Sequence, residues 1–407
     1  MLPSGSLPAL GEGLGAQSSV ANPQSAIRNP QSLLRILQLA VRRPFAWAAV
    51  AFLIVGALSL VLPHPSHRAE ALREFRWTLV EPVLAFALMA RYVRTRTDIF
   101  RVLTAFLVSA ALNAQVGVDQ TLFGDTWSME GVGRAIGLFN SATAFGIFVG
   151  RALAMALALA IFLPTGEDLL RRRRWGYALL CVPLGLGVIL SYTRGAWLGV
   201  GVAVIVVALI ARSRRLLLTI GGLGALGVVY SLFSNVERLN TLFSLTGGTN
   251  VSRLVIWQAA WRVIKAHPLT GIGLDQFLYQ EGYGIPQTRF QTVSHPHNWI
   301  LDTWLRLGLW GLALMAFTFL VYFVLATRAY RGQRNTVRGA LILALIAGMT
   351  DHVVHGLVDM AYFTQDLALV FWFMLGLLGA VLLLPKESAA IAADSPAPLP
   401  QTAPQSV

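Results

Sequence analysis

The sequence predicts an all-α, polytopic integral membrane protein. Of its 407 residues, 56% are hydrophobic and 13% are charged, whereas a soluble domain carries about 25% charged residues. Mean hydropathy is +0.63, and apolar runs close to the roughly 20 residues that cross a bilayer as a helix recur along the chain. A barrel strand is about half that length and alternates in polarity, so long unbroken runs indicate helices.

The apolar runs predict about ten transmembrane helices within one membrane domain, residues 33–385. The segments on either side, 1–32 and 386–407, are rich in Pro, Ser, Ala, Gly or Gln and are expected to be disordered tails. In chain order, the predicted spans are 44–62, 76–92, 99–116, 142–163, 176–192, 196–212, 216–233, 305–327, 338–359 and 365–385.

The arginines predict the orientation of these helices. The net charge of +13 is spread over many short loops, which does not favour nucleic-acid binding. With the N-terminus inside, most arginines fall on the cytoplasmic side, so both termini are expected there under the positive-inside rule. One outer loop, HPSHRAEALREFR at 64–76, carries three arginines and fits this rule poorly.

This topology places residues 113–140 and a large loop, 233–298, outside. Within the loop, Leu254, Trp257, Trp261 and Ile264 recur at helical spacing before Pro268, which predicts a helix lying at the membrane surface.

Arg194 lies in SYTRG, between two apolar runs. The stretch is too short for a long loop, so the two helices must meet in a tight hairpin near the outer headgroup layer. Two interpretations of Arg194 stay open from these residues alone. The arginine either extends to lipid phosphates as an ordinary helix-end residue, or it binds a specific anionic ligand.

Other cationic and polar groups share that side and depth. Guanidinium groups bind phosphate oxygens bidentately, and a lipid diphosphate places its charge at this depth while its tail stays in the bilayer. For Arg262 and Lys265, a solvated face of the loop is the favoured interpretation from these residues alone. His297 and Asn298 are compatible with a helix start that Asn298 caps. The group comprises Arg134, Arg253, Arg262, Lys265, His295, His297 and Asn298.

A second polar set lies in the run 338–359. His352, His355 and Asp359 are spaced to share one helix face, with Asp351 nearby, and Arg151 interrupts another run. Because ionisable residues exposed to lipid are costly, we expect them to face the bundle interior as a hydrogen-bonded wall. A metal site there is the less favoured interpretation.

The chain resembles the O-antigen ligase and polymerase superfamily of bacterial membrane glycosyltransferases. Three stretches carry the resemblance, LSYTRGAW, SRLVIWQAAWRVIKAHPLTGIGLDQF and HPHNWILDTWLRLGLWGL, with a weaker fourth, GRAIGLF. Two positions depart from the family pattern. Arg306 stands where many relatives have an acidic residue, and Ser141, Ala142 and Thr143 replace an Asn-Pro-Asn.

The resemblance implies a GT-C-like enzyme of the bacterial inner membrane. It would transfer or polymerise a glycan carried on undecaprenyl diphosphate, for surface polysaccharide such as lipopolysaccharide, with a glycan or lipid as acceptor. Arg194 and Arg253 would bind the diphosphate, and His297 would be the essential histidine. Further substrate-binding residues are predicted at Arg134, His295, Asn298, Arg262 and His355.

We expect no cofactor and no metal, because two arginines can compensate the charge of a departing diphosphate. No Walker, dinucleotide-binding or zinc-protease motif is present in the sequence. The alternative function is transport of a small anion such as bicarbonate, since some superfamily members carry that label. The residues do not distinguish ligase, polymerase and protein glycosylation.

Overall fold

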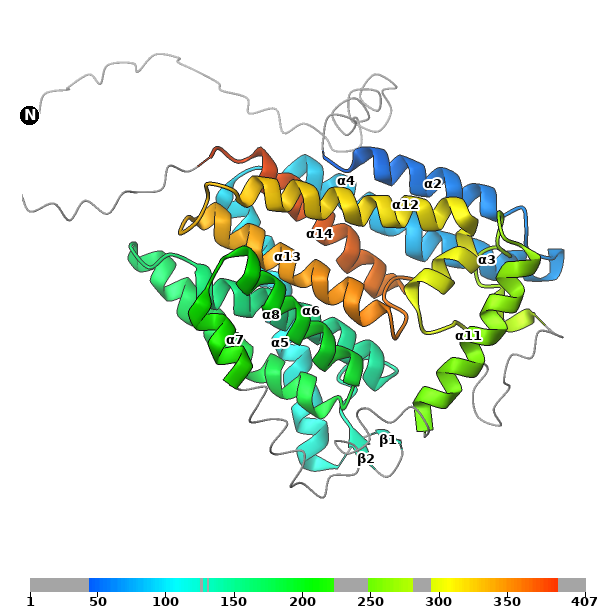
Figure 1. The fold of residues 1–407 in the computed structure, drawn as a ribbon, viewed down its shortest axis with the longest axis horizontal. Coiled ribbons are helices and arrows are strands. Elements are labelled where there is room, and N and C mark those ends of the chain that lie inside the picture. Colours follow the sequence, from blue (N-terminus) through cyan, green and yellow to red (C-terminus); the bar gives the residue numbers. More distant parts are fainter. Residues whose placement is uncertain (1–43, 125–126, 130–131, 223–247, 281–293, 387–407) are drawn as a thin grey trace, which may run out of the picture.

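A computed structural model describes residues 44–124, 127–129, 132–222, 248–280 and 294–386. Helices account for most of it, with a single short β-hairpin in the described residues (Figure 1). In chain order, the elements are α2 Ala46–Ser59, α3 Arg68–Phe75, α4 Glu81–Tyr92, α5 Arg96–Phe123, β1 Trp127–Met129, β2 Val132–Arg134, α6 Ala142–Phe162, α7 Asp168–Leu190, α8 Arg194–Ile210, α11 Gly248–Ala266, α12 Trp299–Tyr330, α13 Val337–Gly356 and α14 Gln365–Leu383.

Six helices of the described residues, α5, α6, α7, α12, α13 and α14, are long and apolar enough to cross a membrane. They confirm a mostly helical, polytopic membrane protein. Nine of the ten predicted spans coincide with described helices, although α2, α4 and α8 are shorter than about 18 residues. Most of the predicted span 216–233 lies outside the described residues, as do the two predicted tails apart from Lys386.

The helix α4 is the end of a longer helical segment. A short π-helical turn, Arg76–Val80, joins α3 to α4, and the backbone stays right-handed helical at both junctions. The continuous helix from Arg68 to Tyr92 is about 37 Å long at 1.5 Å per residue. It therefore reaches from one end of the bundle to the other.

The core of the bundle is α13, which is buried along nearly its whole length and packs against α6, α8, α12 and α14. A helix that is apolar on all sides belongs in such a central position. Polar caps start the surrounding helices. The Thr95 hydroxyl and Asp98 carboxylate form a capping box on α5, and the Ser141 hydroxyl accepts a bond from the amide of Ala144 at the start of α6.

A smaller apolar cluster lies at one end of the bundle, where α3, α11 and the first turns of α12 gather (Figure 1). It joins Ile256 and Val263 of α11 to Phe277 and Leu305. The predicted helix before Pro268 is confirmed as α11. Its buried face includes Ile256, Val263 and Ile264, whereas Leu254 and Trp261 are exposed. The predicted stripe is therefore exposed at two positions and buried at Ile264, and the location of α11 at a membrane surface stays a prediction.

Two glycines let the segment after α11 cross α12 at close range. The backbone of α12 is broken at Gly308, where φ is 69°, and Gly271 has a φ of 67°. A Cβ on either glycine would collide with backbone of the other segment. The amide of Ile272 donates to Leu305 O at 2.7 Å, and the amide of Leu309 donates to Leu269 O at 3.1 Å. Positive φ and close approach are both conditions that glycine satisfies.

Candidate functional site

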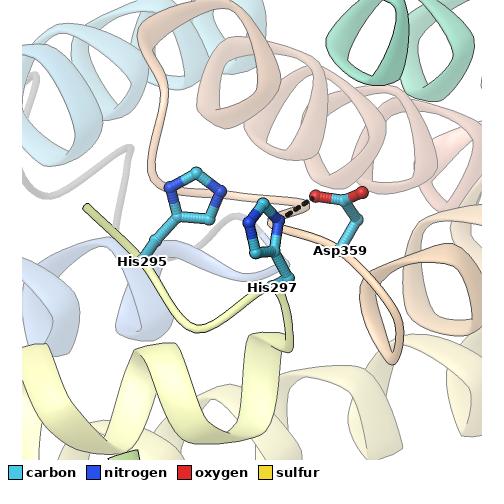
Figure 2. A group of neighbouring side chains, drawn as sticks. All are labelled: His295, His297 and Asp359. Carbon is cyan, nitrogen blue, oxygen red and sulfur yellow. Dashed lines mark hydrogen bonds and ion pairs between the residues drawn. The ribbon is translucent and has the colours of Figure 1, made fainter. Parts of the chain in front are cut away.

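A carboxylate, an imidazole and a guanidinium from three separate parts of the chain meet at Asp359. Its Oδ1 lies 3.0 Å from His297 Nδ1, and its Oδ2 lies 3.1 Å from Arg253 Nη2. The Asp359 side chain is 5% exposed, while Arg253 and His297 are 25% and 31% exposed. Figure 2 shows His297 turned toward Asp359, with His295 beside it. The carboxylate of the cluster is buried, whereas its guanidinium and its imidazole are partly exposed.

Each member of the cluster comes from a well-defined local element. Arg253 lies on α11, His297 lies just before α12, and Asp359 lies in the connection between α13 and α14. The indole of Trp257 on α11 donates to Pro296 O at 2.8 Å. This bond holds residues 295–297, the His-Pro-His segment, against α11.

Asn298 fixes the segment from the other side. Its Oδ1 accepts bonds from the amides of Ile300 and Leu301 at 2.9 and 3.2 Å, so it caps α12, as one interpretation of the sequence proposed. Its Nδ2 donates to Leu357 O at 2.8 Å. The cap thereby ties the start of α12 to the connection that carries Asp359.

Local charges hold Asp359 in its ionised form. Burial by itself would raise the pKa of this carboxyl, but the hydrogen bond and charge of His297 and the positive charge of Arg253 lower it below the usual range. Burial, together with the neighbouring His297, lowers the pKa of His295 to about 3. His295 is therefore neutral at physiological pH.

The bond to Asp359 also orients His297. An anionic carboxylate favours the tautomer in which Nδ1 carries the proton and donates it. His297 has a φ of 51°, a conformation uncommon for residues other than glycine. The structure therefore constrains both the backbone and the ring, and leaves Nε2 as the nitrogen able to accept a proton.

Arg194 starts α8 close to this cluster. The preceding turn, Ser191–Thr193, is the tight hairpin that the sequence predicted between α7 and α8. A Cβ on Gly195 would overlap His355 and Val358, and Val358 is the neighbour of Asp359. The first turn of α8 thus packs directly on the connection that carries Asp359, so Arg194 and Arg253 share one end of the bundle.

Arg134 supports that turn. Its Nε donates to Ser191 O at 2.8 Å and its Nη2 donates to the Thr193 hydroxyl at 3.0 Å. The side chain is buried, and both bonds fix the residues that precede Arg194. Direct contact of Arg134 with a substrate stays a prediction.

Two other predicted residues do not join the Asp359 cluster. Arg262 is exposed on α11 and lies nine residues beyond Arg253, about two and a half turns, which puts it on the opposite face of the helix. His355 is fully buried against α8. Neither of its ring nitrogens has a hydrogen-bond partner among the described residues.

The predicted hydrogen-bonded wall is wrong in two respects. Among the described residues, neither carboxylate oxygen of Asp351, neither ring nitrogen of His355 and not Nδ1 of His352 has a hydrogen-bond partner. Helix α13 ends at Gly356, so Asp359 lies beyond it and turns to His297 and Arg253 instead of sharing a face with His352 and His355. Arg151, as expected, faces the interior. It is fully buried, and its Nη2 donates to Ala361 O at 2.7 Å.

The residues His295, His297 and Asp359 have ligand atoms within 4.8 Å of one another, a grouping found in metal sites. The Asp359 oxygens are already bonded, Oδ1 to His297 and to the amide of Met360, and Oδ2 to Arg253. A guanidinium 3.1 Å away also repels a cation. The arrangement therefore favours an oriented imidazole over a metal centre.

A second ion network lies beside the cluster and was not predicted. Arg306 forms ion pairs with Glu74 of α3 and with Asp302, whose Oδ1 is 2.7 Å from Arg306 Nε. Its guanidinium also stacks on Phe363 at 4.9 Å. This position departs from the family pattern, and the two acids around Arg306 explain how the chain accommodates the arginine.

The comparisons with known proteins cover three residues that lie at this end of the bundle. Residues 179–316 match the family model described as O-Antigen ligase, a range that includes Arg194, Arg253 and His297. A protein named O-antigen ligase from Salmonella typhimurium is 25% identical over 146 residues, 32% of this chain. The match spans about a third of that relative's length, 34%. Both findings confirm the predicted resemblance to the O-antigen ligase and polymerase superfamily, which is carried by residues 179–316.

Proposed function

We propose that this protein transfers or polymerises a glycan carried on undecaprenyl diphosphate, at the outer face of the bacterial inner membrane and without a metal. The observation that supports this most is the Asp359 cluster, in which one buried carboxylate holds both His297 and Arg253, whose side chains are partly exposed. The transporter alternative has no support among the described residues or in the comparisons.

The chemistry requires one bond to form and one to break. A hydroxyl oxygen of the acceptor attacks the anomeric carbon of the glycan, and the bond from that carbon to the diphosphate oxygen breaks, with inversion. His297 Nε2 accepts the proton of the hydroxyl, and Asp359 stabilises the resulting imidazolium. The electron pair of the broken bond leaves with the diphosphate.

Arg194 and Arg253 compensate the charge of the leaving diphosphate. A guanidinium binds two phosphate oxygens in parallel and gains strength where water is partly excluded. Arg194 is also the first residue of α8, a 17-residue helix whose N-terminal amides carry partial positive charge. On binding a diphosphate, Arg253 exchanges part of its contact with Asp359 for phosphate oxygens.

The metal requirement is tested with purified protein, a lipid-linked glycan and an acceptor in excess EDTA. Full transfer is expected, because arginines provide the positive charge. Loss of transfer that Mg²⁺ or Mn²⁺ restores would contradict the proposal, and would point to His295, His297 and Asp359 as ligands.

The bidentate role of Arg194 is tested with Arg194→Lys. Lysine keeps the charge but cannot make two parallel bonds to phosphate, so transfer should fall about 10²-fold, in the range seen for loss of one transition-state donor. Arg212→Lys, near the other end of α8, is the matched control and should retain wild-type transfer. Equal rates for Arg194→Lys and wild type would refute the assignment.

A further inference from the structure

The interior of the bundle holds two ionisable side chains that the Asp359 cluster does not use. Asp351 and His355 lie about one turn apart on α13, and both are fully buried. Neither carboxylate oxygen of Asp351 and neither ring nitrogen of His355 has a hydrogen-bond partner among the described residues. A buried polar group without a partner is costly, and native structures contain few of them. The two side chains therefore point to a ligand or to a second state.

Glycines on the facing helices make room for this pair. A Cβ on Gly199 of α8 would collide with Asp351 Oδ1 and would lie 3.3 Å from His355 Cβ. A Cβ on Gly150 of α6 would lie 3.3 Å from Asp351 Oδ1, and one on Gly195 of α8 would lie 2.7 Å from His355 Nε2. The two side chains and these three glycines form one narrow zone, which we name the buried polar strip.

Two helices pack on Asp351 in this strip, and neither supplies it with a bonded counter-charge. On α8 the carboxylate meets Gly199, and on α6 it meets Gly150. Arg151 follows Gly150 and is fully buried, but its Nη2 donates to a backbone carbonyl of the connection after α13, at 2.7 Å. The charged or titratable groups that face Asp351 are therefore Arg151 of α6 and His355 of its own helix.

The strip is closed on one side and polar on the other. A Cβ on Gly348, about one turn before Asp351, would collide with Met155 and would lie 3.2 Å from Met374 Sδ. In the opposite direction, His355 lies against the first turn of α8, at the end of the bundle that bears the Asp359 cluster. Exchange with the surroundings is therefore expected at the cluster end, by way of His355.

We propose that Asp351 is a proton-binding site inside the bundle, and that His355 carries protons to it from the end that bears the Asp359 cluster. On binding, an O–H bond forms on the Asp351 carboxylate, and the proton comes from water at that end. An imidazole can accept a proton at one ring nitrogen and release one from the other. Aspartates and histidines that follow one another inside membrane helices mark proton relays.

A proton suits this site better than a metal ion does. Calcium and magnesium require several oxygen ligands, whereas the strip offers one carboxylate and one imidazole. The guanidinium of Arg151 also repels a cation. A carboxylate without a partner in an apolar interior is relieved of its charge by protonation. The site is separate from glycan transfer, because neither the donor nor the acceptor takes part in it.

The test is infrared spectroscopy of the full-length protein in phosphatidylcholine nanodiscs, at neutral pH, in H₂O and in D₂O. A protonated carboxyl group gives a C=O stretching band apart from the amide bands, and this band shifts when deuterium replaces the proton. Asp351→Asn should remove one such band from the wild-type spectrum. The matched control is Asp119→Asn, which changes an exposed carboxylate of α5 that is bonded to Gln115, and it should leave the band in place.

The role of His355 is measured by the rate at which the Asp351 band shifts after the protein enters D₂O. Phenylalanine fills similar space but carries no proton, so His355→Phe should slow the shift by about 10²-fold, the lower end of the range for a positioned proton carrier. His352→Phe is the matched control. The His352 ring faces other helices, 5.6 Å from Phe319 and 5.4 Å from Phe371, so the rate should stay that of wild type.

Two results overturn the proposal. If Asp351→Asn removes no carboxylic-acid band, Asp351 is ionised and holds no proton. If His355→Phe and wild type exchange at the same rate, protons do not pass through His355. Thermal unfolding confirms that each variant is folded, and Asp351→Glu, which should displace the band instead of removing it, replaces Asp351→Asn if that variant does not fold. The measurements involve no transfer assay, so their failure is distinct from failure of the proposed function.

Discussion

Two ion networks lie beside the His-Pro-His segment, and they differ in how far they open to the outside. In the first, the buried Asp359 holds Arg253 and His297, both a quarter to a third exposed. In the second, Arg306 is enclosed between Glu74 and Asp302, and all three are nearly inaccessible. Arginines and carboxylates thus form one network that can reach a ligand and one that is enclosed.

The difference separates a role in chemistry from a role in architecture. A buried arginine matched by two carboxylates has no capacity left for a phosphate, and its value lies in joining α3 to the start of α12. An arginine that shares one carboxylate with a histidine can release that partner to bind an anion. Exposure and the ratio of acids to cations therefore distinguish the two networks better than the identity of their residues does.

The largest expected effect is on stability, from Arg306→Met. Removing this side chain leaves Glu74 and Asp302 buried without their cation, which costs about 3–5 kcal/mol. Thermal unfolding in detergent measures the loss, and adding Glu74→Gln and Asp302→Asn should recover most of it. Arg253→Met should lower stability by less, because Asp359 keeps its bonds to His297 and to the amide of Met360. Equal losses for Arg253→Met and Arg306→Met would contradict the distinction between the networks.

The next effect is on transfer, from Arg253→Ala. Loss of a group that stabilises the departing diphosphate should lower kcat about 10²–10³-fold. Arg262→Ala, on the opposite face of the same helix, is the matched control and should remain within about 3-fold of wild type. A comparable loss in both variants would mean that general positive charge on α11, and not the position of Arg253, matters.

Asp359→Asn should have a smaller effect on transfer, about 10–100-fold, as for other groups that orient a functional ligand or base. The amide still accepts a bond from His297 but no longer stabilises the imidazolium. A positioning role for Asp359 therefore predicts a shift in the pH profile of kcat, which a purely structural role would not produce. An unchanged profile would assign Asp359 to scaffolding alone.

The smallest effect concerns acid stability. Because the folded pKa of Asp359 is lowered, its contribution is present above the ordinary carboxyl pKa of about 3.9 and is lost as pH falls through the folded value. The difference in unfolding temperature between wild type and Asp359→Asn should therefore be constant above about pH 5 and narrow as the pH falls below about 3.9. One unit of pKa corresponds to about 1.4 kcal/mol. A difference in unfolding temperature that widens as the pH falls would contradict the predicted direction.

Local patterns predicted much of this molecule. Hydropathy located most of the helices, Pro268 marked the end of α11, and SYTRG gave the tight turn between α7 and α8. Each of these features depends on residues close together in sequence, because hydrophobic periodicity and helix-ending residues are local properties. Arg253 and His297 were singled out among the cationic and polar groups of the outer side, and the resemblance to a known family then indicated their roles.

The partners of those residues could not be predicted in the same way. His297 and Asp359 are 62 residues apart, and Glu74 and Arg306 are 232 apart. No local pattern relates such positions, and Asp359 happens to follow His355 at a helical spacing that suggested the wrong face. The arginines of 64–76 were the clearest available clue that the loop after α2 belongs beside the site.

The crossing of Gly271 and Gly308 has a mechanical consequence for a protein that lies in a fluid bilayer. Two backbone hydrogen bonds hold the segment after α11 to α12 at the break in that helix. We expect the long remainder of α12 to change its tilt with lipid thickness at the break, where a φ of 69° at Gly308 interrupts the helix. His297 and Arg253, which lie on the other side of that break, would then keep their spacing.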